Sequence, residues 1–234
     1  MNSEKTPQKT AIIYLSGAGL TPAIWDAVHS KVTTPNVALT YNRDTTTTLQ
    51  SAVQDVLGQI QKIDATRYVI VAHSLGGVIG VELARTLQDK LGGLIAVSAT
   101  IPAPGKSFIN TLPFPQNFVM PLLLKVAGTK PPASAIQKSL CSDLSDQQAT
   151  DIINAFVSEP RNLYSNKTST SMLPASKYLY VRTLNDKQTP TQLQSSMAKQ
   201  LPDAKITDIA SGHLAMMSHP DELAEIINNF IANL

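Results

Sequence analysis

The chain has 234 residues, of which 43% are hydrophobic and 15% charged, and a formal net charge of +2. This length supports one well-buried core, and the composition is that of a soluble globular domain. The small net charge argues against a nucleic-acid binder and gives no reason to expect an anionic membrane as a partner.

No apolar stretch approaches the ~20 residues that a membrane-spanning helix needs. Residues 1–10 are polar and lack the apolar region of a signal peptide, so we predict a cytoplasmic protein with a short lead-in to its first strand. The single cysteine, Cys141, excludes an internal disulfide, and we expect it to be a small buried apolar side chain. The four histidines lack ligand spacing with acids or with Cys141, so we expect no metal site and no cofactor.

Short apolar runs alternate along the chain with segments of helical periodicity. The runs that we predict to be buried strands are 11–15, 37–39, 67–72, 94–97, 178–181 and 204–209. The helices that we predict between and after them are 49–63, 78–87, 193–201 and a last helix that begins at Pro220. This alternation predicts an α/β fold with a mostly parallel sheet and helices on both faces.

Residues 101–172 interrupt the alternation. Prolines gather there, no strand is evident, and the helices that we expect are 136–140 and 145–157. An insertion of this length exceeds what a connecting loop needs. We predict one domain whose core is 1–100 and 173–234, with 101–172 as a helical cap over the edge of the sheet where such folds bind ligands. An ordinary helical excursion packed on the sheet is the alternative.

Residues 69–77 predict a strand that breaks sharply into a helix, with Ser74 at the turn. Ala72 and Gly76 are small, as they must be where the strand and the helix pass closely. This small-x-Ser-x-small pattern is typical of a nucleophile elbow, which exposes a serine hydroxyl above a sheet. A phosphate-binding loop is the alternative, but no Lys-Ser/Thr pair follows and the glycines lack the required spacing.

A serine hydroxyl becomes a nucleophile when a base removes its proton, and the base needs an acid to orient it. His213 follows the last predicted strand and is the best candidate for the base. The other histidines fit less well, because His29 falls in an upstream surface helix, His73 lies beside the serine, and His219 has the position of a helix cap.

Asp186 is the candidate acid, because it follows the predicted strand 178–181. Asp203 and Asp208 fall before or within the last strand and point less suitably. A turn residue is the alternative for Asp186, since Asn-Asp pairs are common in turns. Ser74, Asp186 and His213 stand in the chain order expected of a triad built on a nucleophile elbow.

An oxyanion formed at the serine would need preorganised N–H donors. The residue after the nucleophile, Leu75, supplies one, and the loop 16–19 (Ser-Gly-Ala-Gly) after the first strand supplies the other through Ala18. The spacing of this loop fits a plain tight turn equally well.

These segments resemble those of α/β-hydrolases, in the branch that contains plant methyl esterases, hydroxynitrile lyases and their bacterial esterase relatives. The similar segments are the elbow 72–77, the acid segment 180–190, the histidine segment 212–223 and part of the cap, 140–147. Ser16 stands where the family usually has the histidine of a His-Gly pair. Gly17 resembles the esterases, whereas the lyases tend to carry threonine, and Leu214 stands where the lyases have lysine.

The resemblance implies a serine carboxylesterase that cleaves a small or medium ester through an acyl-enzyme, with Ser74, His213 and Asp186 as its triad. A hydroxynitrile lyase, an amidase or a C–C hydrolase on the same triad is the first alternative. A ligand-binding sensor with a vestigial hydrolase site is the second. Phe114, Phe118, Met120 and 122–124 fit the wall of a substrate pocket or a core stripe equally well.

Overall fold

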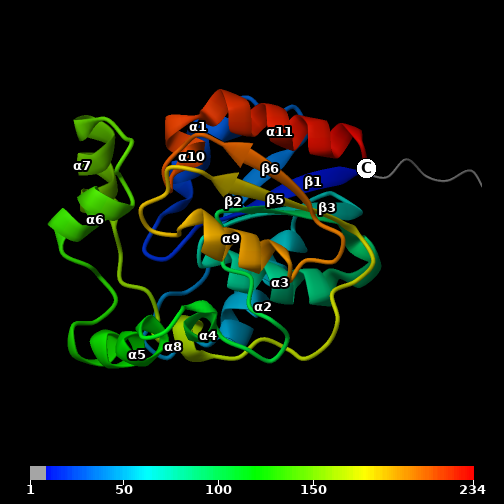
Figure 1. Cartoon of the computed structure of the whole chain (residues 1–234). Coiled ribbons are helices and arrows are strands. Elements are labelled where there is room, and N and C mark those ends of the chain that lie inside the picture. Colours follow the sequence, from blue (N-terminus) through cyan, green and yellow to red (C-terminus); the bar gives the residue numbers. More distant parts are fainter. Residues whose placement is uncertain (1–8) are drawn as a thin grey trace, which may run out of the picture.

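A six-stranded sheet whose neighbouring strands all run parallel forms the middle of the structure, a computed structural model that describes residues 9–234. In chain order the strands are β1 (Thr10–Leu15), β2 (Asn36–Leu39), β3 (Arg67–His73), β4 (Leu91–Val97), β5 (Lys177–Thr183) and β6 (Lys205–Ile209). Their order across the sheet is β2-β1-β3-β4-β5-β6 (Figure 1). All six predicted strands are confirmed. Residues 1–8 of the predicted lead-in lie outside the described residues.

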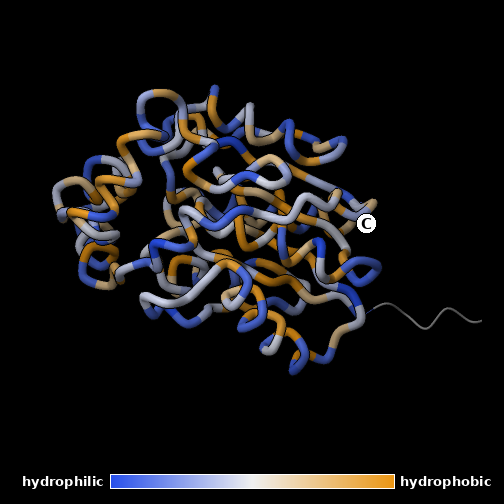
Figure 2. The backbone as a smooth tube through the Cα atoms, turned by 90° about the horizontal axis from the view of Figure 1, so that it is seen from below, coloured by the Kyte–Doolittle hydropathy of each residue, from blue (hydrophilic) through white to orange (hydrophobic). Residues whose placement is uncertain are grey.

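Burial on both faces explains why the central strands are continuous apolar runs. Every residue of β4 is buried, and β3 is buried from Tyr68 onward. The edge strand β6 is more exposed, with Ile206 at 47%, and this explains its weaker apolar pattern. Figure 2 shows apolar segments running through the interior, as this arrangement requires.

Helices cover both faces of the sheet, as predicted (Figure 1). On one face lie α2 (Leu49–Ile60), α3 (Gly76–Leu87) and α9 (Thr191–Ala198), and on the other lie α1 (Asp26–His29), α10 (Ala215–Ser218) and α11 (Pro220–Ala232). Two short 3₁₀ turns, η1 (Pro22–Trp25) and η2 (Gln88–Lys90), complete this part. Alternate side chains of β1 point to opposite faces of the sheet. Ile13 therefore packs in the apolar cluster on one face and Ile12 in the cluster on the other.

The residues between β4 and β5 form helices and no strand. They contain α4 (Phe108–Thr111), α5 (Gln116–Val126), α6 (Ala133–Ser139), α7 (Asp146–Ala155) and α8 (Asn162–Ser165). The predicted helices 136–140 and 145–157 correspond to α6 and α7, whereas α5 was not predicted because it contains Pro121 and begins after Pro115. The division into a core and a cap at 101–172 stays a prediction, and we refer to 101–172 as the inserted segment.

None of the helices in residues 9–234 combines the length and apolar character needed to cross a membrane. The expected cytoplasmic location stays a prediction.

The turn from β3 into α3 depends on close backbone packing. Ser74 has φ of 51°, in the left-handed region that side chains rarely adopt. A Cβ on Gly76 would lie 2.7 Å from the backbone oxygens of Leu15 and Ser16, and a Cβ on Gly77 would lie 2.5 Å from that of Thr100. The predicted strand–turn–helix is therefore present, and its glycines let the turn lie against the loops that follow β1 and β4.

Replacing Gly77 by alanine should lower the free energy of unfolding by about 1–3 kcal/mol, because the added methyl meets rigid backbone. The matched control is Gly58→Ala in α2, where nothing lies within 4 Å of the added Cβ. That change should raise stability by about 0.5–1 kcal/mol through helix propensity. Urea denaturation measures both, and an unchanged stability of the Gly77 variant would contradict the packing described.

Candidate active site

Polar side chains follow four neighbouring strands at the edge of the sheet where the strands end. Ser74 follows β3, Ser98 follows β4, Asp186 follows β5 and His213 follows β6. Because parallel strands present all their carboxyl ends at one edge, loops far apart in the sequence meet there. The structure brings the three predicted residues Ser74, Asp186 and His213 to this edge.

His213 and Asp186 form a buried pair. The Nδ1 atom of His213 lies 2.8 Å from Oδ2 of Asp186, and both side chains are almost fully buried. An ionised carboxylate only accepts hydrogen bonds, so the proton of a neutral imidazole lies on Nδ1 and Nε2 is left as an acceptor. That Nε2 atom is buried and has no hydrogen-bond partner among the described residues.

Four further hydrogen bonds hold the Asp186 carboxylate. The donors are Ser98 Oγ (2.6 Å) and Thr183 Oγ1 (2.8 Å) to Oδ2, and the N–H groups of Gln188 (2.7 Å) and Thr189 (2.8 Å) to Oδ1. Burial by itself would raise the pKa of Asp186, but the neighbouring His213 and these donors hold that pKa well below its usual range. Asp186 is therefore a permanent anion beside the imidazole.

Ser98 is a residue that the sequence reasoning missed. Its hydroxyl lies 3.4 Å from His213 Nδ1 as well as against Asp186, and its backbone has φ of 42°. The available signal was its place directly after β4, next to the strand that precedes Asp186. Of the other acids considered, Asp208 pairs with Arg182 (2.7 Å) and not with His213.

His73 lies behind His213 and does not compete with it as a base. The two rings are 4.6 Å apart, and His73 Nε2 lies 3.0 Å from the backbone oxygen of His213. Complete burial, together with the neighbouring His213 ring, holds the pKa of His73 well below its usual range. The neutral ring therefore donates its Nε2 proton to that oxygen and supports the loop that carries His213.

The two predicted oxyanion donors are free. The N–H groups of Ala18 and Leu75 make no hydrogen bond to a described residue, and both residues line a cavity of about 420 Å³ together with Ser74 and His213. A Cβ on Gly17 would lie 2.8 Å from the Cβ of Ser74, so the loop 16–19 lies directly against the turn. Preorganised N–H donors beside a serine are what an oxyanion needs.

Glu159 fixes the end of this loop and was also missed from the sequence. Its buried carboxylate accepts hydrogen bonds from the Gly19 N–H (2.9 Å) and the Tyr41 hydroxyl (2.8 Å), and Arg43 Nε lies 3.8 Å away. Arg43 also donates to the Leu20 oxygen (2.8 Å). Burial raises the pKa of Glu159 although Arg43 opposes it. An acid far from every motif gave no sequence signal.

Ser16, the departure from the family pattern, holds the same loop. Its hydroxyl accepts a hydrogen bond from Trp25 Nε1 (3.2 Å) and donates one to the Thr21 oxygen (3.2 Å). Both hydrogen-bonding directions of this side chain are thus used inside the protein.

The inserted segment also contacts the loop of the base. Asp143, between α6 and α7, accepts a hydrogen bond from the Gly212 N–H at 2.5 Å. A Cβ on Gly212 would lie 2.3 Å from the same carboxylate. Asp143 and Glu159 therefore connect the inserted segment to the two loops that flank the turn at Ser74.

Ser74 also borders a second cavity, of about 770 Å³, between α4, α5 and residues 187–197. Met120 and Leu123 line both cavities, and Leu124 lines the smaller one. Of the two alternatives left open by the sequence, the pocket wall therefore fits Met120, Leu123 and Leu124. Neither alternative fits Phe114, Phe118 and Leu122, which line neither cavity and are exposed to solvent.

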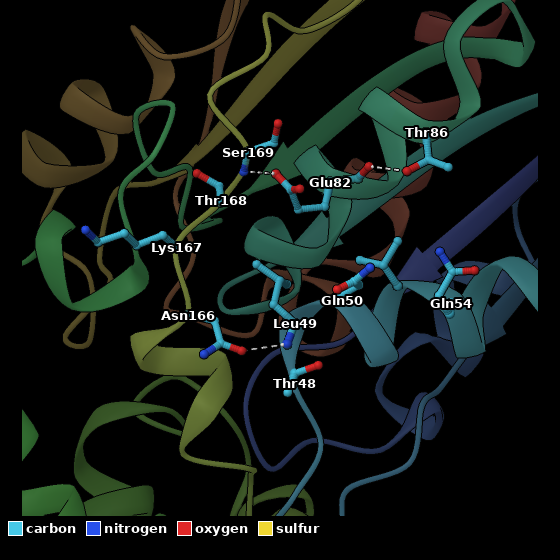
Figure 3. A pocket seen from close by; sticks show the side chains of 11 residues that line it. Thr48, Leu49, Gln50, Gln54, Glu82, Thr86, Asn166, Lys167, Thr168 and Ser169 are labelled. Carbon is cyan, nitrogen blue, oxygen red and sulfur yellow. Dashed lines mark hydrogen bonds between the residues drawn. The ribbon is translucent and has the colours of Figure 1, made fainter.

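A hollow of about 640 Å³ lies apart from this site, between α2, α3 and residues 166–169 (Figure 3). Its polar groups bond to one another: Asn166 Oδ1 accepts from the Leu49 N–H, and Glu82 accepts from the Ser169 N–H, both at 3.0 Å. None of the predicted site residues lines it.

The cysteine and the two other histidines lie away from the triad residues. Cys141 is buried as expected, and burial raises its pKa to about 11. His29 is exposed on α1. His219 occupies the N-cap position of α11, as expected, and its backbone oxygen accepts the hydrogen bond of the Leu223 N–H (3.1 Å). Its side chain makes no capping hydrogen bond, and its Nδ1 lies 2.9 Å from the Ser218 hydroxyl. Within residues 9–234 no three potential ligands gather to hold a metal ion.

The model of the alpha/beta hydrolase family matches residues 12–226, and the chain belongs to this family. A curated relative is a carbendazim-hydrolyzing esterase of Nocardioides sp. (strain SG-4G), which is 32% identical over 66 residues. That match spans 28% of this chain and 27% of the relative, so the chain matches about a quarter of that esterase's length.

Several solved structures share the fold. An extracellular alpha/beta-hydrolase from a Paenibacillus species, described as homologous in structure and function to tobacco salicylic acid binding protein 2, has a TM-score of 0.84 at 17% identity and covers 94% of this chain and 98% of its own. A pyrethroid hydrolase from Sphingobium faniae JZ-2 has 0.71 at 21% identity (95% and 97% covered). Polyneuridine aldehyde esterase has 0.76 at 15% identity (95% and 99% covered). The α/β-hydrolase fold predicted from the sequence is confirmed.

The raised pKa of Glu159 predicts a pH effect on stability. The folded state holds this proton more strongly than the unfolded state, so the contribution of Glu159 is fully present below about pH 4.3, the usual glutamate value, and is lost as pH rises through the raised pKa. In Glu159→Gln this loss should be absent. Denaturant titrations from pH 4 upward measure the difference, with Glu225→Gln on exposed α11 as the control. Equal pH slopes in the wild type and Glu159→Gln would contradict the assignment.

Proposed function

We propose that this chain is a serine carboxylesterase that cleaves small or medium carboxylic esters through an acyl-enzyme on Ser74. The observation that carries the proposal is the acceptor atom Nε2 of His213, which is buried and unpartnered while Asp186 holds the opposite nitrogen. His213 and Ser74 line one cavity, so a base and a nucleophile share a space that a substrate can enter.

In the first half of the proposed reaction, Ser74 Oγ attacks the ester carbonyl carbon while His213 Nε2 takes the hydroxyl proton. The carbonyl oxygen becomes an oxyanion, to which the N–H groups of Ala18 and Leu75 donate. The tetrahedral intermediate then collapses and the bond to the alcohol oxygen breaks. The alcohol leaves with the proton from His213, and the acyl group stays on Ser74.

In the second half, a water molecule replaces the alcohol. His213 takes a proton from this water as the water oxygen attacks the acyl carbon, and the same N–H groups stabilise the second oxyanion. The bond to Ser74 Oγ breaks, His213 returns the proton to it, and the carboxylic acid leaves. The Asp186 anion stabilises the imidazolium in both halves, which is consistent with its low pKa.

The surroundings of the triad favour ester hydrolysis over cyanohydrin cleavage. A threonine at position 17, as in the lyases that the chain resembles, would place its Cβ 2.8 Å from the Cβ of Ser74 and 3.0 Å from His73 Nδ1. Leu214 is completely buried and supplies no charge beside the base, where the lyases have lysine. A cyanide leaving group would therefore have no cationic partner at this position.

Replacing Ser74 by alanine should lower kcat for p-nitrophenyl acetate by roughly 10⁴-fold or more, because the nucleophile is lost. Ser134→Ala, at an exposed position on α6 outside both cavities, is the matched control and should keep the wild-type rate. Hydrolysis by the Ser74 variant at the wild-type rate would contradict the proposal.

Replacing Asp186 by asparagine should also lower kcat, by roughly 10⁴-fold, because the amide no longer fixes the tautomer of His213. The KM should change little, since Asp186 lines neither cavity. Parallel assays of cyanide release from mandelonitrile separate the lyase alternative: the wild type should release none at enzyme concentrations that hydrolyse the ester. Cyanide release without ester turnover would favour the lyase.

A further inference from the structure

One side of helix α5 exposes an apolar surface. Phe118, Leu122 and Val126 recur every four residues and therefore share one face of the helix, and they are 72%, 64% and 79% exposed. Phe114, 80% exposed, extends this face, with its ring 5.9 Å from that of Phe118. We call these four residues the α5 face. Contiguous apolar patches on a protein surface mark interaction sites more often than chance exposure does.

The charged residues of the stretch 101–142, which contains the α5 face, all have one sign. Residues 101–142 contain four lysines and no arginine, aspartate or glutamate, although the whole chain is nearly neutral. These lysines are all exposed, and none forms an ion pair with a described residue. They are Lys106, Lys125, Lys130 and Lys138. Lys125, three residues after Leu122, lies at the margin of the α5 face. The average charge of the chain thus conceals a segment that is both apolar and basic.

The opposite side of the same helix belongs to the candidate active site. Met120 and Leu124 point away from the α5 face. Met120 and Leu123 line both cavities that Ser74 borders, and Leu124 lines the smaller one. The helix therefore separates the exposed apolar surface from the space in which we propose that the ester reacts. Anything held on the α5 face lies one helix away from Ser74.

We propose that the α5 face docks on an anionic phospholipid surface and brings Ser74 to apolar esters dissolved in that surface. Apolar side chains flanked by lysines are the combination that binds at the interface of anionic membranes without crossing them. A second copy of the chain fits less well, because a two-fold contact through this face would bring the lysines of both copies together. The choice of substrate rests on the proposed esterase function, whereas the docking does not.

The experiment is co-sedimentation of the whole protein with large vesicles of phosphatidylcholine, either pure or with about a third phosphatidylglycerol. The wild type should bind the anionic vesicles, bind the neutral ones more weakly, and dissociate with added salt. Phe118→Ser/Leu122→Ser should lower the partition coefficient by roughly tenfold or more, since the variant lacks two apolar side chains that would enter the lipid surface. Lys125→Glu should lower it about fivefold or more on anionic vesicles only.

The controls separate this proposal from the esterase proposal. Ile206→Ser and Lys205→Glu, on the exposed edge strand β6, should bind vesicles like the wild type. The double variant should hydrolyse soluble p-nitrophenyl acetate at the wild-type rate, because neither of its positions lines a cavity. A wild type that binds anionic vesicles but cleaves no ester would overturn the proposed esterase function and leave the proposed docking intact.

Two results would overturn the docking itself. One is a wild type that stays in the supernatant when the anionic vesicles sediment, and the other is equal binding by the wild type and the Phe118/Leu122 double variant. Analytical ultracentrifugation completes the test: a dimer that the double variant abolishes, without vesicle binding by the wild type, would assign the α5 face to a second copy.

Discussion

The site depends on one buried carboxylate. Asp186 accepts hydrogen bonds from Ser98 after β4, from Thr183 at the end of β5 and from His213 after β6, so a single anion connects the ends of three strands. A buried charge is costly unless it is paired and hydrogen-bonded, and these partners meet that requirement while lowering the pKa of Asp186. The same contacts fix the tautomer of His213 and leave its Nε2 free. The same hydrogen bonds to Asp186 thus hold the strand ends together and prepare His213 for the proposed reaction.

A second buried carboxylate, that of Glu159, holds the loop 16–19, which carries the proposed oxyanion donor Ala18. Glu159, between α7 and α8 of the inserted segment, accepts a hydrogen bond from the Gly19 N–H and lies near Arg43, which in turn donates to the Leu20 oxygen. Its pKa is raised where that of Asp186 is lowered, because Glu159 receives fewer donors for its burial. Through Glu159 and Asp143 the inserted segment sets the loops beside Ser74, in addition to forming the wall of the cavities.

The sequence predicted the parts of this molecule that depend on local pattern. Buried strands appear as apolar runs, and the turn at Ser74 requires small residues, so both could be found from neighbouring positions. Helix α5 could not be predicted, because Pro121 indicates a break in a helix. The helix is stabilised by tertiary contacts of Met120 and Leu124, which a local pattern does not show. Ser98 and Glu159 were missed for a different reason: their partners lie 88 and 140 residues away, and no pattern in one sequence connects them.

The central claim is that Ser74 is activated by the His213–Asp186 pair. The most direct measurement is peptide mass spectrometry of the protein after reaction with a fluorophosphonate probe, compared between the wild type and Asp186→Asn. We expect the adduct on the peptide that contains Ser74, with labelling much slower in the variant. An adduct on another serine, or equal labelling rates in the two proteins, would contradict the account.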